Sequence, residues 1–147
     1  MSLKNLLKGS AFAVAILWSQ FALAWDWNAQ QRGWVDSVFL GPFPSPLPPN
    51  SQPATVSGWA CVRPDLFNGV TPPATFALYQ GGPPGIGYAV PGISFTSYQY
   101  PAVVELGGCG NNDNGFVISF APIPNVPMSF YVTYNGPYGQ TLLEGAH

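Results

Sequence analysis

The sequence predicts an all-β protein, a two-sheet antiparallel β-sandwich with one disulfide. The chain has 147 residues, of which 17 are proline and 17 are glycine. No window of about a dozen residues keeps an uninterrupted helical apolar period. Short runs rich in Val, Ile, Thr, Phe and Tyr alternate instead with turn residues. Two widely separated cysteines, Cys61 and Cys109, complete the pattern.

The first 24 residues are predicted to be a cleaved, helical signal peptide. Lys4 and Lys8 give a positive start, residues 11–18 are apolar, and Ala22-Leu23-Ala24 fits the small-x-small cleavage pattern. A membrane anchor needs about 20 continuous apolar residues, and Ser19 and Gln20 interrupt this run. We therefore expect a secreted chain, periplasmic or extracellular, with no membrane span after cleavage.

The 123 residues that follow suit one domain. We expect an N-terminal segment at residues 25–32 and a β-sandwich domain at residues 33–147. A proline-rich surface loop at residues 41–53 holds six prolines in 13 residues. It is expected to run extended, as a stiff loop or as a protein-binding strip.

Charge excludes two classes of partner. After cleavage the cations are Arg32 and Arg63, against six acidic side chains, so the net charge is −4. A nucleic-acid binder needs a basic stripe, and binding to an anionic membrane needs a polybasic patch. We expect neither partner.

The strands are predicted from short β-branched and aromatic runs bounded by turn residues. Phe116, Ile118 and Phe120 alternate with polar or smaller residues, so one face of that strand should be buried and the other solvated. The same period places Phe130, Val132 and Tyr134 inward, and Ser129, Tyr131 and Thr133 outward. The expected strands are Trp34–Leu40, Ala54–Val62, Ala74–Gln80, Ile86–Val90, Tyr98–Leu106, Phe116–Ala121, Ser129–Asn135 and Gln140–Leu143, with one helical turn at Asp65–Asn68.

Cys61 and Cys109 are predicted to form a structural disulfide. In an exported chain a pair of cysteines usually joins. A zinc site needs more ligands, a redox site usually shows CxxC, and a catalytic cysteine needs a histidine. The one histidine is the terminal His147. Closing a loop of about 50 residues stabilises the fold by about 4 kcal/mol, a large share of a typical domain's stability.

Trp59 is expected beside this disulfide. It lies two residues before Cys61, so both side chains point to the same side of one strand. We predict that Trp59 fills core volume next to the bond to Cys109, near the end of the fifth strand. A tryptophan packed on a disulfide is also found in immunoglobulin-type sandwiches, although the spacing and order differ here.

Several segments, taken in order, resemble a small secreted bacterial β-sandwich module, Ig-like or jelly-roll-like. Such modules accompany extracellular hydrolases or occur alone. The resemblance implies an accessory domain with no catalytic residues to carry over. After the strand that ends in Gly58-Trp59-Ala60-Cys61, such modules are expected to have polar residues, whereas this chain has Val62 and Arg63. The proline-rich loop is an insertion relative to these modules. The matching segments are Gly33–Val38, Val56–Cys61, Ala74–Gly82, Gly108–Gly110, Gly115–Phe120, Tyr131–Asn135 and Thr141–Leu143.

Catalysis is not expected. A glycosidase needs two carboxyl groups about 5–10 Å apart across a cleft. Structure explains Asp36, Asp65 and Asp113, whereas Glu105 lies late in a predicted strand and Glu144 in the tail. A serine hydrolase needs a histidine within the fold. Calcium in the turn at residues 111–115 is conceivable, but a plain turn explains the Asn and Asp residues better. We therefore expect no catalytic site, no metal and no cofactor.

Aromatic residues carry the functional hypotheses. Trp25 and Trp27 flank Asp26 at the new N-terminus, Phe67 lies in the turn after Arg63-Pro64, and Tyr138 lies at a predicted hairpin tip. Exposed aromatics suit stacking on a sugar or contact with a protein. The first hypothesis is a recognition module for carbohydrate or cell-envelope glycan. The second is a structural or assembly role with other exported proteins. In a third, the aromatics only pack against neighbouring segments.

Overall fold

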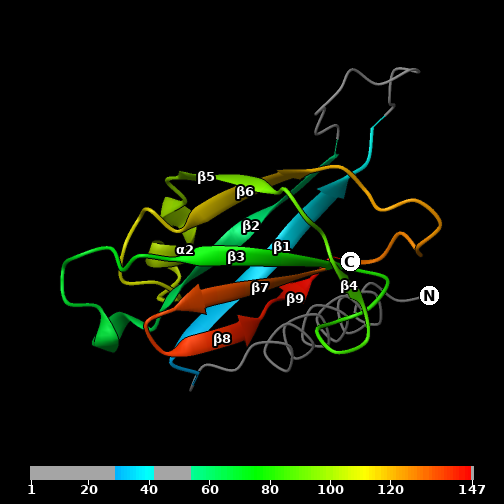
Figure 1. The fold of residues 1–147 in the computed structure, drawn as a ribbon. Helices are drawn as coiled ribbons and strands as arrows, with labels where there is room; N and C mark the ends of the chain where they lie inside the picture. The colour runs from blue at the N-terminus through cyan, green and yellow to red at the C-terminus, as the bar shows by residue number, and fades with distance from the viewer. Residues whose placement is uncertain (1–28, 42–53, 147) are drawn as a thin grey trace, which may run out of the picture.

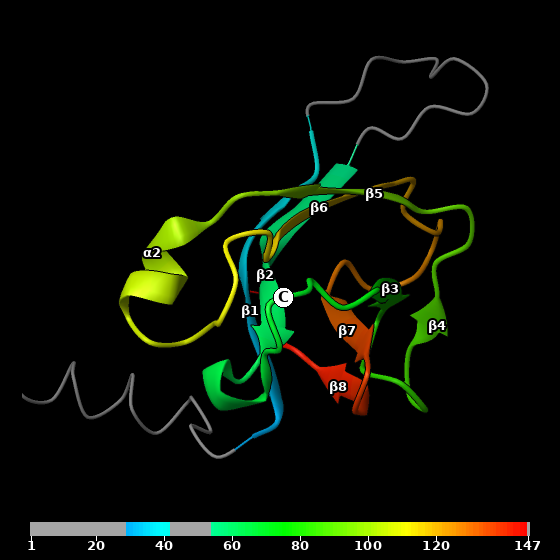
Figure 2. The same cartoon turned by 90° about the vertical axis from the view of Figure 1, so that its left-hand side faces the viewer.

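The computed structural model describes residues 29–41 and 54–146. The predicted signal peptide, Trp25, Trp27 and nearly all of the proline-rich loop lie outside these residues. In the described part, strands form two sheets packed face to face (Figures 1 and 2). The predicted all-β sandwich is confirmed.

Sheet A has five strands in the order β5-β6-β2-β1-β9, and sheet B has four in the order β4-β3-β7-β8. Neighbouring strands pair antiparallel, except that β9 pairs parallel with β1. The elements are β1 (Gln31–Phe39), β2 (Ala54–Val62), the 3₁₀ turn η1 (Pro64–Leu66), β3 (Thr75–Gln80), β4 (Tyr88–Ala89), β5 (Ser94–Tyr98), α2 (Pro101–Glu105), β6 (Gly115–Phe120), β7 (Phe130–Gly136), β8 (Gly139–Leu142) and β9 (Glu144–Gly145).

The main core lies between the two sheets. On β6, Phe116, Ile118 and Phe120 are each at most 1% exposed, and the ring centroid of Phe120 lies 4.9 Å from that of Phe130 on β7. The predicted two-residue period of β6 is therefore confirmed. The buried members of this core are Val35, Ala54, Val56, Ala60, Leu78, Val90, Phe116, Ile118, Phe120, Phe130, Val132, Tyr134 and Leu143.

The predicted period of β7 is correct for its inner face and wrong at one outer position. Phe130, Val132 and Tyr134 are buried as expected, but Thr133 is also fully buried. The reason is that β7 lies between β3 and β8 in sheet B. In addition, Gln140 Nε2 donates a hydrogen bond of 3.2 Å to Thr133 Oγ1.

The predicted strand Tyr98–Leu106 is wrong. Its first residue ends β5, and residues 101–105 form the short helix α2. Pro101 begins this helix, where its fixed φ and missing N–H are tolerated. Gly107 follows the helix with a φ of 76°, a left-handed conformation that suits glycine. Cys109 accordingly lies in the loop after α2 and not near the end of a strand.

Other boundaries differ less. The predicted strand Ala54–Val62 coincides with β2, whereas β1 begins at Gln31, before the expected Trp34. The expected strand Ile86–Val90 shrinks to two residues in β4, and β5 and β9 include residues that the sequence patterns left outside any strand. The expected helical turn is a 3₁₀ turn at Pro64–Leu66.

The disulfide between Cys61 and Cys109 is confirmed, with Cα atoms 5.8 Å apart. Trp59 packs beside it at 5% exposure, as predicted. However, this cluster is separate from the main core. Even-numbered residues of β2, such as Ala60, face sheet B, so Trp59 and Cys61 face the opposite side. The bond therefore links sheet A to the α2 loop and does not join the two sheets.

Candidate functional site

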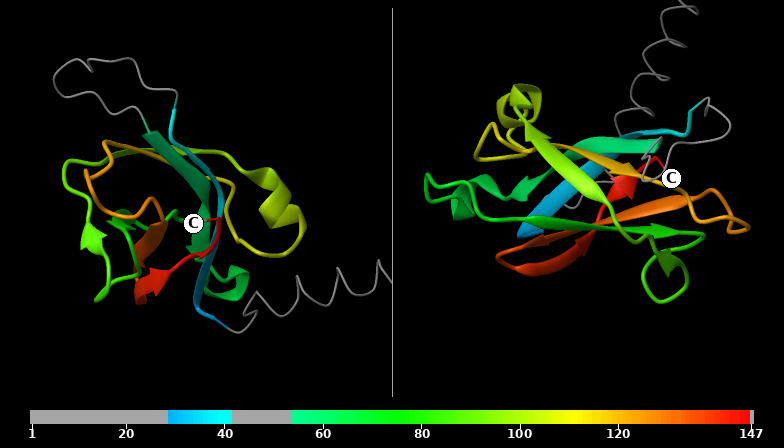
Figure 3. Two further views of the ribbon diagram at one scale, coloured as in Figure 1. Left: turned by 90° about the vertical axis from the view of Figure 1, so that its right-hand side faces the viewer. Right: turned by 45° about the horizontal axis from the view of Figure 1, so that its top comes forward.

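The outer face of sheet A carries a pocket beside α2. Figure 2 and the left panel of Figure 3 show α2 on the side of sheet A that faces away from sheet B. The pocket has a volume of about 200 Å³. We call it the outer-face pocket; its lining residues are Trp34, Asp36, Trp59, Tyr100, Ala102, Val103 and Leu106.

A β-bulge in β1 places Ser37 beside Asp36 on this face. Val35 pairs with Gly58 and Ser37 pairs with Ser57, so Asp36 is the extra residue of the bulge. Without it, strict alternation would turn Ser37 toward the core. With it, Ser37 Oγ lies 2.8 Å from Ser57 Oγ at the exposed surface. Asp36 and Ser37 therefore both belong to the outer face, whereas Val35 is fully buried in the core.

Close backbone packing supports the bulge. A Cβ atom added to Gly58 would lie 2.1 Å from the carbonyl oxygen of Trp34. No side chain fits at that distance, so β1 and β2 can approach in this way only because residue 58 is glycine.

The pocket wall is held by the disulfide cluster. Val103 of α2 is 3% exposed, Cys109 is 2% exposed, and both pack with Trp59. Leu106, at the end of the wall, remains 69% exposed. The α2 segment is only five residues long, too short to be stable alone. It keeps its place through this packing and through the covalent bond to β2.

Asp36 is the charged group of the pocket. Partial burial raises the pKa of its carboxyl group, and a hydrogen bond from the Tyr100 side chain acts in the opposite direction. Desolvation, together with the nearby Asp36 charge, raises the pKa of Tyr98 and of Tyr100. The ring centroids of these tyrosines lie 5.9 Å apart, and Tyr98 Oη donates to the Gly58 carbonyl at 3.3 Å. One carboxylate thus lies within a group of aromatic side chains.

A second hollow brings together two of the aromatics singled out by sequence, Phe67 and Tyr138. It has a volume of about 240 Å³, and we call it the proline–aromatic cleft. Tyr138 is 45% exposed and Val70 is 69% exposed, so the cleft presents apolar surface to solvent. Its lining residues are Val62, Leu66, Phe67, Asn68, Val70, Pro72, Pro73, Pro137 and Tyr138.

Gln31 positions the hairpin that carries Tyr138. Its side chain is 3% exposed, and its Nε2 donates to the Gly139 carbonyl and to Thr141 Oγ1, each at 2.9 Å. Its Oε1 accepts the Tyr138 backbone N–H at 2.8 Å. The first residue of β1 therefore fixes the β7–β8 hairpin tip, more than 100 residues away in sequence.

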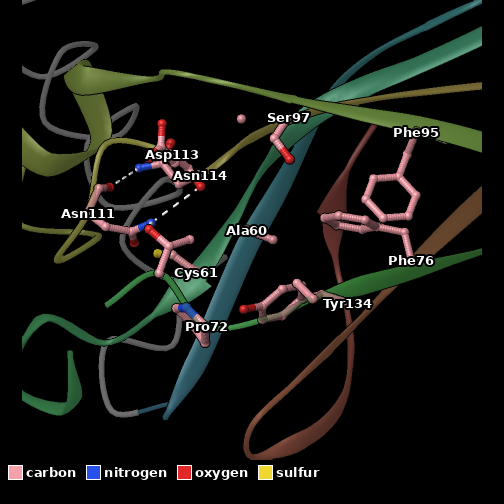
Figure 4. Close-up of a pocket in the computed structure, with 13 residues that line it drawn as sticks. Ala60, Cys61, Pro72, Phe76, Phe95, Ser97, Asn111, Asp113, Asn114 and Tyr134 are labelled. Atoms are coloured by element: carbon pink, nitrogen blue, oxygen red, sulfur yellow. Dashed lines mark hydrogen bonds between the residues drawn. The ribbon is translucent and has the colours of Figure 1, made fainter. Parts of the chain in front are cut away.

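A third, smaller cavity opens at one end of the sandwich, with a volume of about 80 Å³ (Figure 4). One end is polar, since Asn114 is 3% exposed and its Oδ1, like that of Asn111, has no hydrogen-bond partner among the described residues. The other end carries Phe76 and Phe95, whose ring centroids lie 5.3 Å apart. A space of this size and polarity suits ordered water better than a sugar.

Residues 29–41 and 54–146 contain no candidate metal site. No group of three or more His, Cys, Asp or Glu side chains there could hold a metal ion. Asp65 forms an ion pair with Arg63 at the surface, and this pairing lowers the pKa of the Asp65 carboxyl group. Within the same residues, no helix is long and apolar enough to cross a membrane.

Sequence patterns identified only part of these sites. Phe67 and Tyr138 share one cleft, but Trp25 and Trp27 lie outside the described residues, so their relation to it stays a prediction. The outer-face pocket was missed, because Trp59 was assigned to packing and Tyr100 to a strand. Pro101, the first residue of α2, is the sequence signal that could have indicated a helix at the pocket wall.

Comparison of the chain with protein-family models, with curated proteins and with solved structures gave no match. The resemblance to secreted β-sandwich modules therefore depends on the sequence segments quoted above. The fold agrees with its coarse expectation of two sheets and one disulfide.

Proposed function

We propose that the chain is a secreted, non-catalytic recognition module that binds a glycan in the outer-face pocket. The observation that carries this proposal is the position of Asp36 among Trp34, Trp59 and Tyr100. Aromatic side chains offer flat apolar surface that can stack on a sugar ring. A carboxylate accepts hydrogen bonds from hydroxyl groups and so fixes the ring's orientation.

The size of the pocket suits a short part of a saccharide. Pockets for drug-sized ligands usually measure about 300–1,000 Å³, and this one measures about 200 Å³. Trp34 is half-buried and Asp36 is exposed, so the pocket opens on the surface and adjacent sugar units can continue outside it. We infer that one sugar ring of a longer chain occupies the space beside α2.

The test is glycan binding by the exported form, residues 25–147. Soluble oligosaccharides and insoluble cell-wall polysaccharides are offered to the purified protein, and binding is followed by calorimetry, by sedimentation and by tryptophan fluorescence. Trp34→Ala is expected to weaken binding at least tenfold, because it removes one aromatic wall of the pocket.

Tyr88→Ala is the matched control. Tyr88 is 64% exposed on the short strand β4 of sheet B, on the opposite side of the sandwich, so its loss should leave affinity unchanged. If no glycan binds, or if both variants bind like the wild-type protein, glycan recognition at this pocket is wrong. Release of sugar products during incubation would contradict the non-catalytic part of the proposal.

Export is a further part of the proposal. A disulfide persists in an oxidising compartment, and the disulfide here holds the pocket wall. Mass spectrometry of the protein secreted by its host should find a chain that begins at Trp25 and has no reactive thiols. A chain that keeps its first 24 residues would contradict the predicted cleavage.

A second candidate function, assembly with other exported proteins, is favoured by the proline–aromatic cleft. Exposed Tyr138 and Val70 beside prolines form an apolar surface of the kind that binds proteins. In this case Tyr138→Ser should reduce self-association in sedimentation velocity, or recovery of an envelope partner in a pull-down, without changing glycan binding. A strictly monomeric protein that recovers no partner would exclude assembly.

A further inference from the structure

We propose that the outer-face pocket selects saccharides that carry a protonated amine, such as glucosamine units, over neutral or acidic sugars. This inference depends on the proposed glycan-binding function and adds the chemical class of the ligand. It is carried by the charge of the pocket, in which Asp36 lies among aromatic side chains and has no cationic partner within residues 29–41 and 54–146.

The described residues contain two basic side chains, and neither neutralises Asp36. Arg63 forms its ion pair with Asp65, beyond the end of β2. Arg32 shares the outer face of β1, but it lies four positions before Asp36, about 13 Å along an extended strand. Its guanidinium Nη2 donates to the Ala29 carbonyl, farther still from the pocket.

The groups around Asp36 favour a cation. A hydrogen bond from the Tyr100 side chain favours the ionised form of Asp36, and a carboxylate has capacity to accept from further donors. Trp34, Trp59 and Tyr100 line the same space, and the faces of such rings attract ammonium groups. A protonated amine can therefore form a charge-assisted hydrogen bond to Asp36 and a cation–π contact in one position.

The same arrangement disfavours other sugars. An N-acetylated sugar is neutral and gains only the aromatic contact and ordinary hydrogen bonds. A uronic acid brings a second carboxylate toward Asp36, and like charges repel in a partly desolvated site. The wall adds no compensating cation, because α2 has the sequence PAVVE.

The experiment compares two oligosaccharides of equal length and linkage, a β-1,4-linked glucosamine tetramer and its fully N-acetylated form. Binding to residues 25–147 is measured by calorimetry at pH 6 and low salt, where the amines are protonated. The wild-type protein is expected to bind the amine form at least tenfold more tightly. Added salt should shrink this preference, because screening weakens the partly exposed ion pair.

Two variants separate a specific contact from general attraction between an acidic protein and a cationic sugar. Asp36→Asn keeps an oxygen that can accept from Tyr100 but removes the charge. It should weaken amine binding about tenfold and change binding of the acetylated form less than twofold. Asp113→Asn makes the same change in net charge at an exposed turn and should leave the preference intact.

The outcomes distinguish this inference from the proposed function. If both tetramers bind the wild-type protein equally, or if Asp36→Asn weakens both alike, amine selection is wrong and glycan recognition stands. If Asp113→Asn abolishes the preference as Asp36→Asn does, the preference reflects net charge and the inference is also wrong. If neither tetramer binds and no other glycan does, the proposed function itself fails.

Discussion

Trp34 lies opposite Trp59 in the antiparallel pairing of β1 with β2. Both are on the face of sheet A that α2 covers, whereas their neighbours Val35 and Ala60 belong to the core on the other side. Directly opposed aromatic pairs stabilise a sheet by about 0.2–1 kcal/mol relative to alanine. Their larger consequence here is geometric, because a single pairing register places two indole rings in one pocket.

The first prediction concerns the disulfide. Replacing Cys61 and Cys109 by alanine should lower the free energy of unfolding by about 4 kcal/mol, because the unfolded chain loses a constraint on a long loop. It should also weaken glycan binding, since the α2 wall is no longer tied to β2. Urea unfolding and calorimetric titration measure the two effects.

Wild-type protein treated with a reductant is the control for the substitutions themselves, and it should match the double variant in both measurements. A double variant that keeps full affinity for the glycan would show that α2 stays in place without the bond.

The second prediction concerns Gln31, which fixes the Tyr138 hairpin. Gln31→Leu should lower the free energy of unfolding by about 1–3 kcal/mol, because the Tyr138 N–H and the Gly139 carbonyl lose buried partners. It should also reduce any protein association through the proline–aromatic cleft while glycan binding persists. Gln30→Leu, at an exposed position, should cost less than about 1 kcal/mol.

The third prediction concerns Gln80, a fully buried side chain on β3. Its Oε1 accepts the Ile123 N–H at 2.7 Å, and its Nε2 donates to the carbonyls of Ile123 and Val126 at 3.0 and 3.1 Å. Gln80→Leu should cost about 3 kcal/mol in urea unfolding and expose the loop between β6 and β7 to proteases. Unchanged proteolysis of that loop would show that it has other anchors.

The fourth prediction is a pH dependence of stability. Burial raises the pKa of Asp36 in the folded protein, so the folded state holds its proton to higher pH than the unfolded state. Ionisation of Asp36 therefore costs stability as the pH rises from the unfolded pKa through the folded one, and the full cost remains at neutral pH. Relative to wild type, Asp36→Asn should therefore raise the free energy of unfolding more, or lower it less, at pH 7 than at pH 3.

Asp65→Asn is the control of opposite sign. The Arg63 side chain lowers the pKa of Asp65, so its ionised form contributes stability that is lost as the pH falls. Relative to wild type, Asp65→Asn should lower the free energy of unfolding more at pH 7 than at pH 3. Urea unfolding at both pH values measures each difference, and equal signs for the two variants would contradict these pKa directions.

Local patterns in the sequence predicted the sandwich, because a strand buried on one face has a period of two. The inner residues of β6 and the bounds of β2 follow directly from this period. The pairing of Cys61 with Cys109 followed from the export signal and from the lack of other partners. The side of the sheet on which the bond lies was missing, since one strand does not indicate which face meets its partner sheet. The position of Cys109 in a loop after α2 was missing too.

The outer-face pocket could not be predicted in the same way. The pocket contains Trp34 and Asp36, which strict alternation already places on one face, but the pattern gives no sign of the extra residue in β1 that adds Ser37 to that face. The pocket also depends on α2, a helix too short to have a helical period of its own. Phe67 and Tyr138 could be found because aromatic residues within predicted turns are visible in sequence, although their proximity depends on the contacts of Gln31.

The placement of the disulfide outside the inter-sheet core has a consequence for maturation. Neither cysteine belongs to the apolar cluster between the two sheets, so we expect a reduced chain to assemble the sandwich with lower stability. Oxidation then closes the side wall of a cavity on a preformed scaffold. If the proposed glycan recognition is correct, passage into an oxidising environment completes the binding pocket after folding, and the reduced chain should bind sugars more weakly.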